Sequence, residues 1–242
     1  MMQAFATRLL LGALWLIHWL PLAAQARIGQ GLGALLYRLA GSRRRIALRN
    51  LELCFPHKGA AEREALAREH FGWLGRSIVE RGLLWWASRE RLMKLIHVEG
   101  EVDLAERSER PVMWLVPHFM ALDVAGASVL LFQKRKGASI YQQQTNPVMD
   151  AIMREGRLRL GNAVIFPRSD SAKPLIREIR QGTGFFNLPD MDFGERDAAF
   201  VPFFGVPAAT LLAPSRMAKL LNMTVQPVLA EMLPGGQGYR VR

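Results

Sequence analysis

Short apolar runs alternate with helical patterns from about residue 96 to the end of the chain. The β-like runs are IHVEG, VMWLVP, ASIYQQ, AVIFP, TGFFNLP and MTVQPVLAEM. Between them, a segment from about residue 120 and the segments MDAIMREGRL and KPLIREIRQG have the apolar spacing of helices. Strands that alternate with helices are typical of an α/β sheet, and we therefore predict one α/β domain over residues 96–242.

The N-terminal pattern differs because it is apolar almost throughout. Residues 9–24 read LLLGALWLIHWLPLAA, a run slightly shorter than the roughly 20 residues of a membrane-spanning helix. Basic residues follow it, including RRR at 43–45, and positive charge after an apolar run keeps the rest of a chain in the cytoplasm. We predict a membrane-anchoring helix over residues 1–27. A signal peptide cleaved near Ala26 and an ordinary core helix are the alternatives.

A second helical region, next to the membrane, is predicted over residues 28–95. Its first part is small and apolar, and the basic helix SRRRIALRNLELCFP follows and ends at Pro56. The segment from Ala60 to about Ile96 is helical by its three- and four-residue spacing. The basic helix could present a solvated face or a surface that meets phosphates beside the membrane.

The composition adds a strong positive charge. The chain has 32 Lys and Arg against 21 Asp and Glu, a net charge of +11, which favours nucleic acid, anionic lipid or an acidic carrier protein as partner. Nucleic acid is disfavoured because the basic residues gather beside an apolar anchor and no base-reading motif is present. The single Cys54 excludes an intramolecular disulfide and a cysteine-rich metal site. The five histidines are scattered, so we expect no metal.

Two polar residues interrupt the apolar stretch VPHFMALDVAG, at the junction between a predicted strand and a predicted helix. If His118 lies in the turn and Asp123 in the first helical turn, the carboxylate can hold one imidazole nitrogen and leave the other free as a base. The alternative is a buried structural pair, because the HxxxxD spacing by itself is a weak signal. No Ser or Cys stands beside His118, so the sequence favours a base that activates a substrate hydroxyl.

Four segments together resemble those of a known family: RRRIALRNLELCFP, PHFMALD, YQQQTNPVMD and NLPDMDFGERDAAFVPFFGVPAAT. They resemble the bacterial late acyltransferases of lipid A biosynthesis, the lauroyl/myristoyl transferase family of the glycerolipid acyltransferase superfamily. The resemblance covers nearly the whole chain, from the N-terminal anchor to about residue 232. It implies an α/β fold with a mixed sheet flanked by helices, preceded by an N-terminal membrane-anchoring helical region.

The resemblance also implies roles for individual residues. His118 is similar to the general base that deprotonates the acceptor hydroxyl, and Asp123 to its orienting acid, where many members have Glu. Arg168, in FPRSDSAKPLI, and Asp190, in LPDMDFG, match positions that we assign to substrate binding; a structural ion pair is the alternative. Met191 departs from the PDQD sequence that is frequent in the family.

The implied reaction moves a fatty acyl chain from acyl carrier protein to a hydroxyl of a lipid A precursor, in lipopolysaccharide biosynthesis. The implied partners are the carrier protein with its acyl thioester, the glycolipid and the membrane, and the implied location is the cytoplasmic face of the bacterial inner membrane. Such chemistry needs a base and oxyanion donors, and no cofactor or metal. The alternatives are another acceptor, such as a lysophospholipid or an aminoacyl lipid, and a noncatalytic basic protein that binds membrane surfaces.

Three other segments have less specific interpretations. The arginines of REGRLRLG offer cations for phosphates or an acidic carrier, or else form a solvated helix face. In FVPFFGVPAAT we expect the phenylalanines at 200, 203 and 204 to be core or to line an acyl tunnel, with prolines that fix turns. VQPVLAEMLPGGQGYRVR predicts a hairpin whose second strand either is terminal or continues into a missing C-terminal portion.

Overall fold

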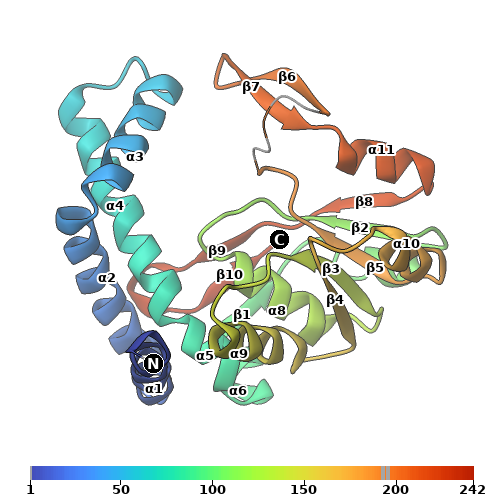
Figure 1. Ribbon diagram of the computed structural model, residues 1–242, viewed down its shortest axis with the longest axis horizontal. Coiled ribbons are helices and arrows are strands. Elements are labelled where there is room, and N and C mark those ends of the chain that lie inside the picture. The colour runs from blue at the N-terminus through green and yellow to red at the C-terminus, as the bar shows by residue number, and fades with distance from the viewer. Residues whose placement is uncertain (1, 192–193, 195–196) are drawn as a thin grey trace.

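The computed structural model describes residues 2–191, 194 and 197–242, and the regular elements that it has before the first strand are all helices (Figure 1). The early helices are α1 (Met2–Ile17), α2 (Leu22–Leu39), α3 (Gly41–Cys54), α4 (Ala60–Val79), α5 (Arg81–Trp86) and α6 (Arg89–Leu95). The later ones are α7 (Leu104–Arg107), α8 (Leu122–Phe132), α9 (Pro147–Leu158), α10 (Lys173–Arg180), α11 (Ala213–Leu220) and the short 3₁₀ helix η1 (Pro234–Gly236).

Within the described part of the chain, the strands form three sheets. They are β1 (Ile96–Val98), β2 (Val112–Leu115), β3 (Gly137–Tyr141), β4 (Ala163–Pro167), β5 (Gly184–Asn187), β6 (Ala198–Phe203), β7 (Val206–Leu211), β8 (Thr224–Pro227), β9 (Ala230–Met232) and β10 (Tyr239–Val241). The main sheet is parallel, in the order β4-β3-β5-β2-β8. The sheet β1-β10-β9 is mixed, and β6 and β7 form a separate antiparallel hairpin. The predicted α/β fold with mixed sheets flanked by helices is therefore confirmed.

Both faces of the main sheet are covered, as its apolar strands require. On one face, Trp114 of β2 packs in a cluster with residues of α5, α8 and α9. On the other face, the neighbouring Met113 packs with Leu175 and Ile179 of α10. Because successive strand residues point to opposite faces, the continuous apolar run VMWLV serves both clusters.

The apolar N-terminal run is divided between two helices, which differs from the single anchoring helix predicted over residues 1–27. α1 ends at Ile17 and α2 begins at Leu22, directly after Pro21. Proline disfavours the helical conformation of the residue before it, so the chain turns there. Among the helices of the described residues, none is both long and apolar enough to cross a membrane.

Glycines let α2 and α4 approach each other very closely. A Cβ added to Gly33 would lie 2.1 Å from the carbonyl oxygen of Phe71, and one added to Gly75 would lie 2.1 Å from the carbonyl oxygen of Gly29. Gly29 and Gly33 have the small-xxx-small spacing that allows helix backbones to touch. The two helices therefore form a tight antiparallel pair along the side of the molecule (Figure 1).

A buried polar network joins α4 to the C-terminal strands. Arg76 Nε donates to Glu80 Oε1 at 2.6 Å, and Arg76 Nη1 donates to the carbonyl of Leu233 at 2.9 Å. The Tyr239 hydroxyl donates to the other oxygen of Glu80 at 2.7 Å. Burial and the charge of Glu80 raise the pKa of Tyr239 well above its ordinary value. The network therefore fixes the helical pair against the mixed sheet.

Two local predictions differ from the structure. The segment predicted as one helix from Ala60 to about Ile96 is divided into α4, α5 and α6. The phenylalanines of FVPFFGVPAAT are expected in the core or along an acyl tunnel, but they lie at the surface: Phe200, Phe203 and Phe204 are 60%, 58% and 55% exposed. The prolines of this segment stand in the strands of the β6–β7 hairpin, opposite each other, and the turn falls between them.

We predict that Gly33→Ala lowers the free energy of unfolding by about 1–3 kcal/mol, because the added methyl group forces α2 away from α4. Gly31→Ala is the matched control on the same helix, since among the described residues no atom beyond its chain neighbours and its own helix backbone lies within 4 Å of the added Cβ. It is expected to stabilise by about 0.5–1 kcal/mol through helix propensity. Denaturant unfolding of the purified chain, followed by circular dichroism, measures both. Equal effects of the two changes would contradict the close packing.

Candidate active site

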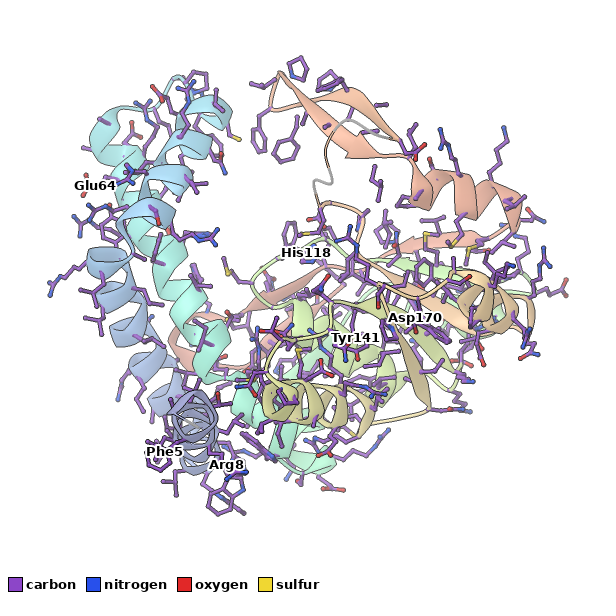
Figure 2. The ribbon with its side chains drawn as sticks, in the orientation of Figure 1. Phe5, Arg8, Glu64, His118, Tyr141 and Asp170 are labelled. Atoms are coloured by element: carbon purple, nitrogen blue, oxygen red, sulfur yellow. The ribbon has the colours of Figure 1, made fainter. Side chains whose placement is uncertain are left out.

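Three of the predicted site residues follow the carboxyl ends of strands in the main sheet. His118 comes after β2, Arg168 after β4 and Asp190 after β5. Because these strands are parallel, their carboxyl ends lie at one edge of the sheet, where open α/β sheets bind ligands. Figure 2 shows His118 above this edge, on the side that faces the β6–β7 hairpin.

The sheet order brings Asp190 directly to His118. β2 and β5 are neighbours, and Leu115 of β2 is in register with Asn187 of β5. The His118 ring nitrogen Nδ1 lies 2.7 Å from Asp190 Oδ1, and the His118 backbone N–H donates to Asp190 Oδ2 at 2.8 Å. One carboxylate therefore holds both the ring and the backbone of the same histidine.

This arrangement sets the chemistry of the imidazole. An ionised carboxylate only accepts hydrogen bonds, so Nδ1 carries the proton and Nε2 presents a lone pair. The His118 side chain is 34% exposed, which leaves it accessible to a substrate. The pair can thus act as a general base whose orientation is fixed by Asp190.

Asp123 has a different position from the one predicted for it. The sequence predicts a contact between Asp123 and His118, whereas the ring nitrogen of His118 meets Asp190. The Asp123 carboxylate instead accepts from Arg157 Nη2 at 3.1 Å and lies 3.1 Å from Arg81 Nε. Asp123 stands in the first turn of α8, from which its side chain reaches α5 and α9. It therefore connects three helices.

The two arginines determine the protonation of Asp123. Burial raises the pKa of this carboxyl, but the charges and hydrogen bonds of Arg157 and Arg81 outweigh it, so the pKa is lowered from its ordinary value. The favourable position of a carboxylate at a helix N-terminus acts in the same direction. Asp123 is therefore an ionised member of a structural ion-pair cluster. Nothing in the spacing of the sequence connects it with Arg81.

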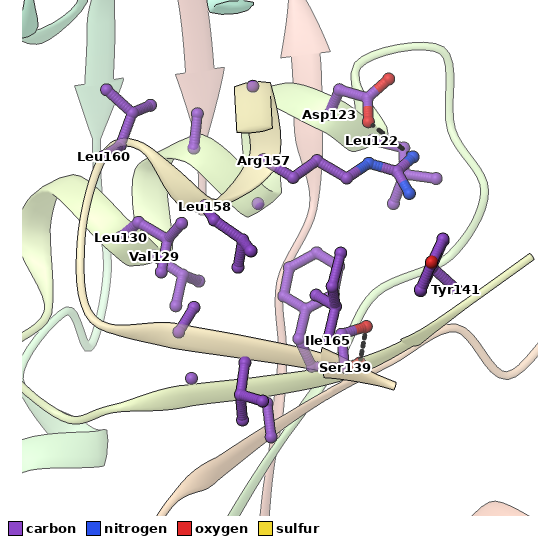
Figure 3. Close-up of a pocket in the computed structure, with 18 of the residues that line it drawn as sticks. Leu122, Asp123, Val129, Leu130, Ser139, Tyr141, Arg157, Leu158, Leu160 and Ile165 are labelled. Carbon is purple, nitrogen blue, oxygen red and sulfur yellow. Dashed lines mark hydrogen bonds and ion pairs between the residues drawn. The ribbon is translucent and has the colours of Figure 1, made fainter. Parts of the chain in front are cut away.

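A mostly apolar cavity lies beside this cluster, between the main sheet and helices α8 and α9 (Figure 3). Val129, Leu130 and Phe186 are among its apolar lining residues, and Asp123 and Arg157 form a polar part of its wall. Leu122 and Leu188 also line the cavity, and each is close along the chain to a member of the His118–Asp190 pair. The cavity suits an extended apolar group more than a polar one.

The other predicted cations are placed differently. Arg168 is exposed, and three strand spacings separate β4 from β2, which amounts to roughly 14 Å. In REGRLRLG, Arg159 donates to the carbonyls of Leu84 and Ala87, and Arg154 lies over the ring of Tyr141. Arg154 and Arg159 are nevertheless exposed, whereas Arg157 is partly buried against Asp123. The second aspartate of PDMD, at position 192, lies outside the described residues.

Comparison with known proteins gives consistent matches over most of the chain. The profile of the family described as bacterial lipid A biosynthesis acyltransferase matches residues 1–242. The lipid A biosynthesis lauroyltransferase of Escherichia coli (strain K12) is 32% identical over 96% of this chain and 75% of its own length. The palmitoleoyltransferase of the same strain is 34% identical over 81% of this chain and 63% of its own length. The myristoyltransferase of that strain is 36% identical over 84% of this chain and 62% of its own length. The chain thus spans between three fifths and three quarters of these relatives.

We predict that Asp123→Asn lowers the free energy of unfolding by about 1–2 kcal/mol at neutral pH, because two arginines lose their partner. The folded-state pKa of Asp123 is lowered, so its contribution is fully present above the unfolded value of about 3.9 and is lost as the pH falls through the folded value. Denaturant unfolding at steps from pH 7 towards pH 2 should show the difference from the unmodified chain shrinking below about pH 4. The exposed Asp170→Asn is the control, with little expected effect. A difference that persists unchanged to the lowest pH would contradict the ion-pair account.

Proposed function

Because the chain belongs to the bacterial lipid A biosynthesis acyltransferase family, we propose that it transfers a fatty acyl chain from an acyl carrier protein thioester to a hydroxyl of a lipid A precursor. The observation that supports this chemistry most is the His118–Asp190 pair at the carboxyl edge of the sheet. It supplies a base of fixed orientation and an accessible lone pair, which is what activation of a hydroxyl requires.

The proposed reaction proceeds in two steps. His118 Nε2 removes the proton of the acceptor hydroxyl while that oxygen attacks the thioester carbonyl carbon, which gives a tetrahedral intermediate. The carbon–sulfur bond then breaks, the new ester forms, and the imidazolium returns its proton to the departing carrier thiolate. Asp190 stays ionised throughout and stabilises the imidazolium, as the buried carboxylate does in serine hydrolases.

The apolar cavity is proposed to hold the donor's acyl chain. Its walls are formed mainly by aliphatic and aromatic side chains, and each methylene removed from water contributes about 0.8 kcal/mol. The Asp123–Arg157 pair gives one part of the wall a polar character, so the apolar tail is expected to lie away from it. The thioester carbonyl would then lie towards the His118–Asp190 pair.

The exposed arginines of α3 are proposed to attract the anionic substrates. Arg43 and Arg45 are exposed, whereas Arg44 donates to the carbonyl of Tyr37 and lies over its ring. A phosphorylated glycolipid and an acidic carrier protein both complement such a surface. Exposed charges act over about 10 Å at 0.1 M salt, which suits capture more than chemistry.

We also propose that α1 and α2 hold the protein at the cytoplasmic face of the inner membrane, where carrier-bound acyl chains are made. Phe5 of α1 and Leu39 of α2 are 65% and 73% exposed, and Trp19, in the turn between these helices, is 66% exposed. Large apolar side chains at the surface of helices are typical of helices lying in the membrane interface. This placement would keep the acceptor lipid and the site together.

A mass-spectrometric assay of the purified chain tests the proposed function. Acyl carrier protein loaded with defined acyl chains is the donor, and a panel of lipid A precursors and lysophospholipids provides the acceptors. We predict acylation of the lipid A precursor and a loss of roughly 100- to 10,000-fold in rate for His118→Ala. The exposed His97→Ala, in β1, is the matched control and should retain full activity. Transfer to lysophospholipid alone, or near-normal turnover of His118→Ala, would refute the proposal.

The double change Arg43→Gln and Arg45→Gln is expected to raise the apparent KM for lipid or carrier and to make it less sensitive to salt. Turnover at saturating substrate should change little, because these charges steer association rather than the reaction. Lys173→Gln with Arg180→Gln removes the same charge from exposed positions of α10 and is the control. Loss of kcat at unchanged KM, or an equal effect of the control pair, would contradict a capture role for α3.

A further inference from the structure

The β6–β7 hairpin stands apart from the rest of the fold. Figure 1 shows it projecting from the main sheet on the side of the α3–α4 helices. Within the described residues its strands pair with each other alone, from Ala198 opposite Leu211 to Phe203 opposite Val206. The two-residue loop of Phe204 and Gly205 has positive φ at both positions, as a type I′ turn requires.

Both faces of this hairpin are apolar at its tip. Phe200, Phe203 and Phe204 are more than half exposed, and Val201, which points to the face opposite Phe200, is 42% exposed. A hairpin that packed on the core would bury one face and present polar residues on the other. An isolated two-stranded hairpin is at best marginally stable in water, so this one needs an apolar partner on both sides.

Neighbouring groups indicate what that partner is. The ring of Phe204 contacts Phe55, at the end of α3, with centroids 5.1 Å apart and planes tilted by 63°. α3 has no buried residues: it exposes Leu53 near this contact, and Ile46 with the arginines at 43 and 45 in the turns that begin the helix. Apolar side chains beside exposed arginines complement the anionic headgroups and acyl boundary of a membrane surface.

We propose that the tip of the β6–β7 hairpin (Phe200, Phe203 and Phe204) and the adjoining end of α3 insert into the interfacial layer of an anionic lipid bilayer. This is a second membrane contact, separate from α1, on the side of the molecule where His118 lies (Figure 2). Unpaired backbone groups along the hairpin edges are costly in hydrocarbon, so the tip stays at the depth of the headgroups. The insertion itself does not depend on the proposed function. Only the reason given for the insertion, which is delivery of a lipid acceptor to the site, rests on that function.

Position-specific fluorescence tests the insertion without any turnover. In the full chain with Cys54→Ser, Phe203→Cys carries an environment-sensitive fluorophore, and Leu220→Cys, on α11, is the control because Leu220 is 76% exposed. On vesicles of phosphatidylglycerol and phosphatidylcholine that contain headgroup-nitroxide lipid, we expect a blue shift and at least threefold quenching at position 203, and neither at position 220. Bound protein without quenching at 203, or equal quenching at both positions, would overturn the proposal. A blue shift that needs no vesicles and grows with protein concentration would show that a second copy covers the tip, and would also overturn it.

A kinetic comparison separates lipid delivery from a role in the reaction. The triple change of Phe200, Phe203 and Phe204 to Ser should raise KM tenfold or more for an acceptor embedded in vesicles. It should leave kcat and KM for a detergent-dispersed acceptor within twofold, and Leu220→Ser should change neither. An equal loss in both formats, with the melting temperature preserved, would place the tip in the reaction site and overturn the membrane role. If the unmodified chain transfers no acyl group, the proposed function fails while the fluorescence result still decides the insertion.

Discussion

The pairing of β2 with β5 is the constraint on which the proposed chemistry depends. Because the two strands are neighbours in a parallel sheet, the segments that follow them emerge at the same edge, and Asp190 reaches both the ring and the backbone of His118. The clusters on the two faces of the sheet hold this pairing, with Trp114 packed on one side and Met113 on the other. A base oriented by a carboxylate is therefore a consequence of strand order.

The same constraint explains what could and could not be predicted from the sequence. The apolar runs predict nearly all strands of the two larger sheets, and the polar interruptions locate the edge at which His118 and Asp190 meet. The partner of His118 could not be deduced, because HxxxxD spacing is local whereas strand order is not. For similar reasons, Asp123 had no visible link to Arg81 on a distant helix. The hairpin with prolines in both strands was missed because proline usually marks turns, and it is tolerated here because both strands are edges.

In the proposed account, the helical region connects the membrane-facing side chains to the candidate active site. The glycine contacts hold α2 against α4, and the Arg76–Glu80–Tyr239 network fixes α4 to the strands β9 and β10. The exposed apolar side chains of α2 thereby have a defined orientation relative to these strands. The ring of Phe55, which follows α3, packs against the ring of Phe204 at the turn of the β6–β7 hairpin. In the proposed account, the lipid-facing surfaces border the edge of the sheet that holds His118.

A double-mutant cycle on kcat/KM tests the central claim, that His118 and Asp190 act as one unit, most directly. The four proteins are the unmodified chain, His118→Ala, Asp190→Asn and the double variant, and a parallel cycle replaces Asp190→Asn by Asp123→Asn. We expect Asp190→Asn to be costly when His118 is present and to cost almost nothing once His118 is removed, because the carboxylate acts through the imidazole. An Asp190→Asn effect of equal size in both backgrounds, or full coupling of His118 to Asp123 instead, would contradict the account.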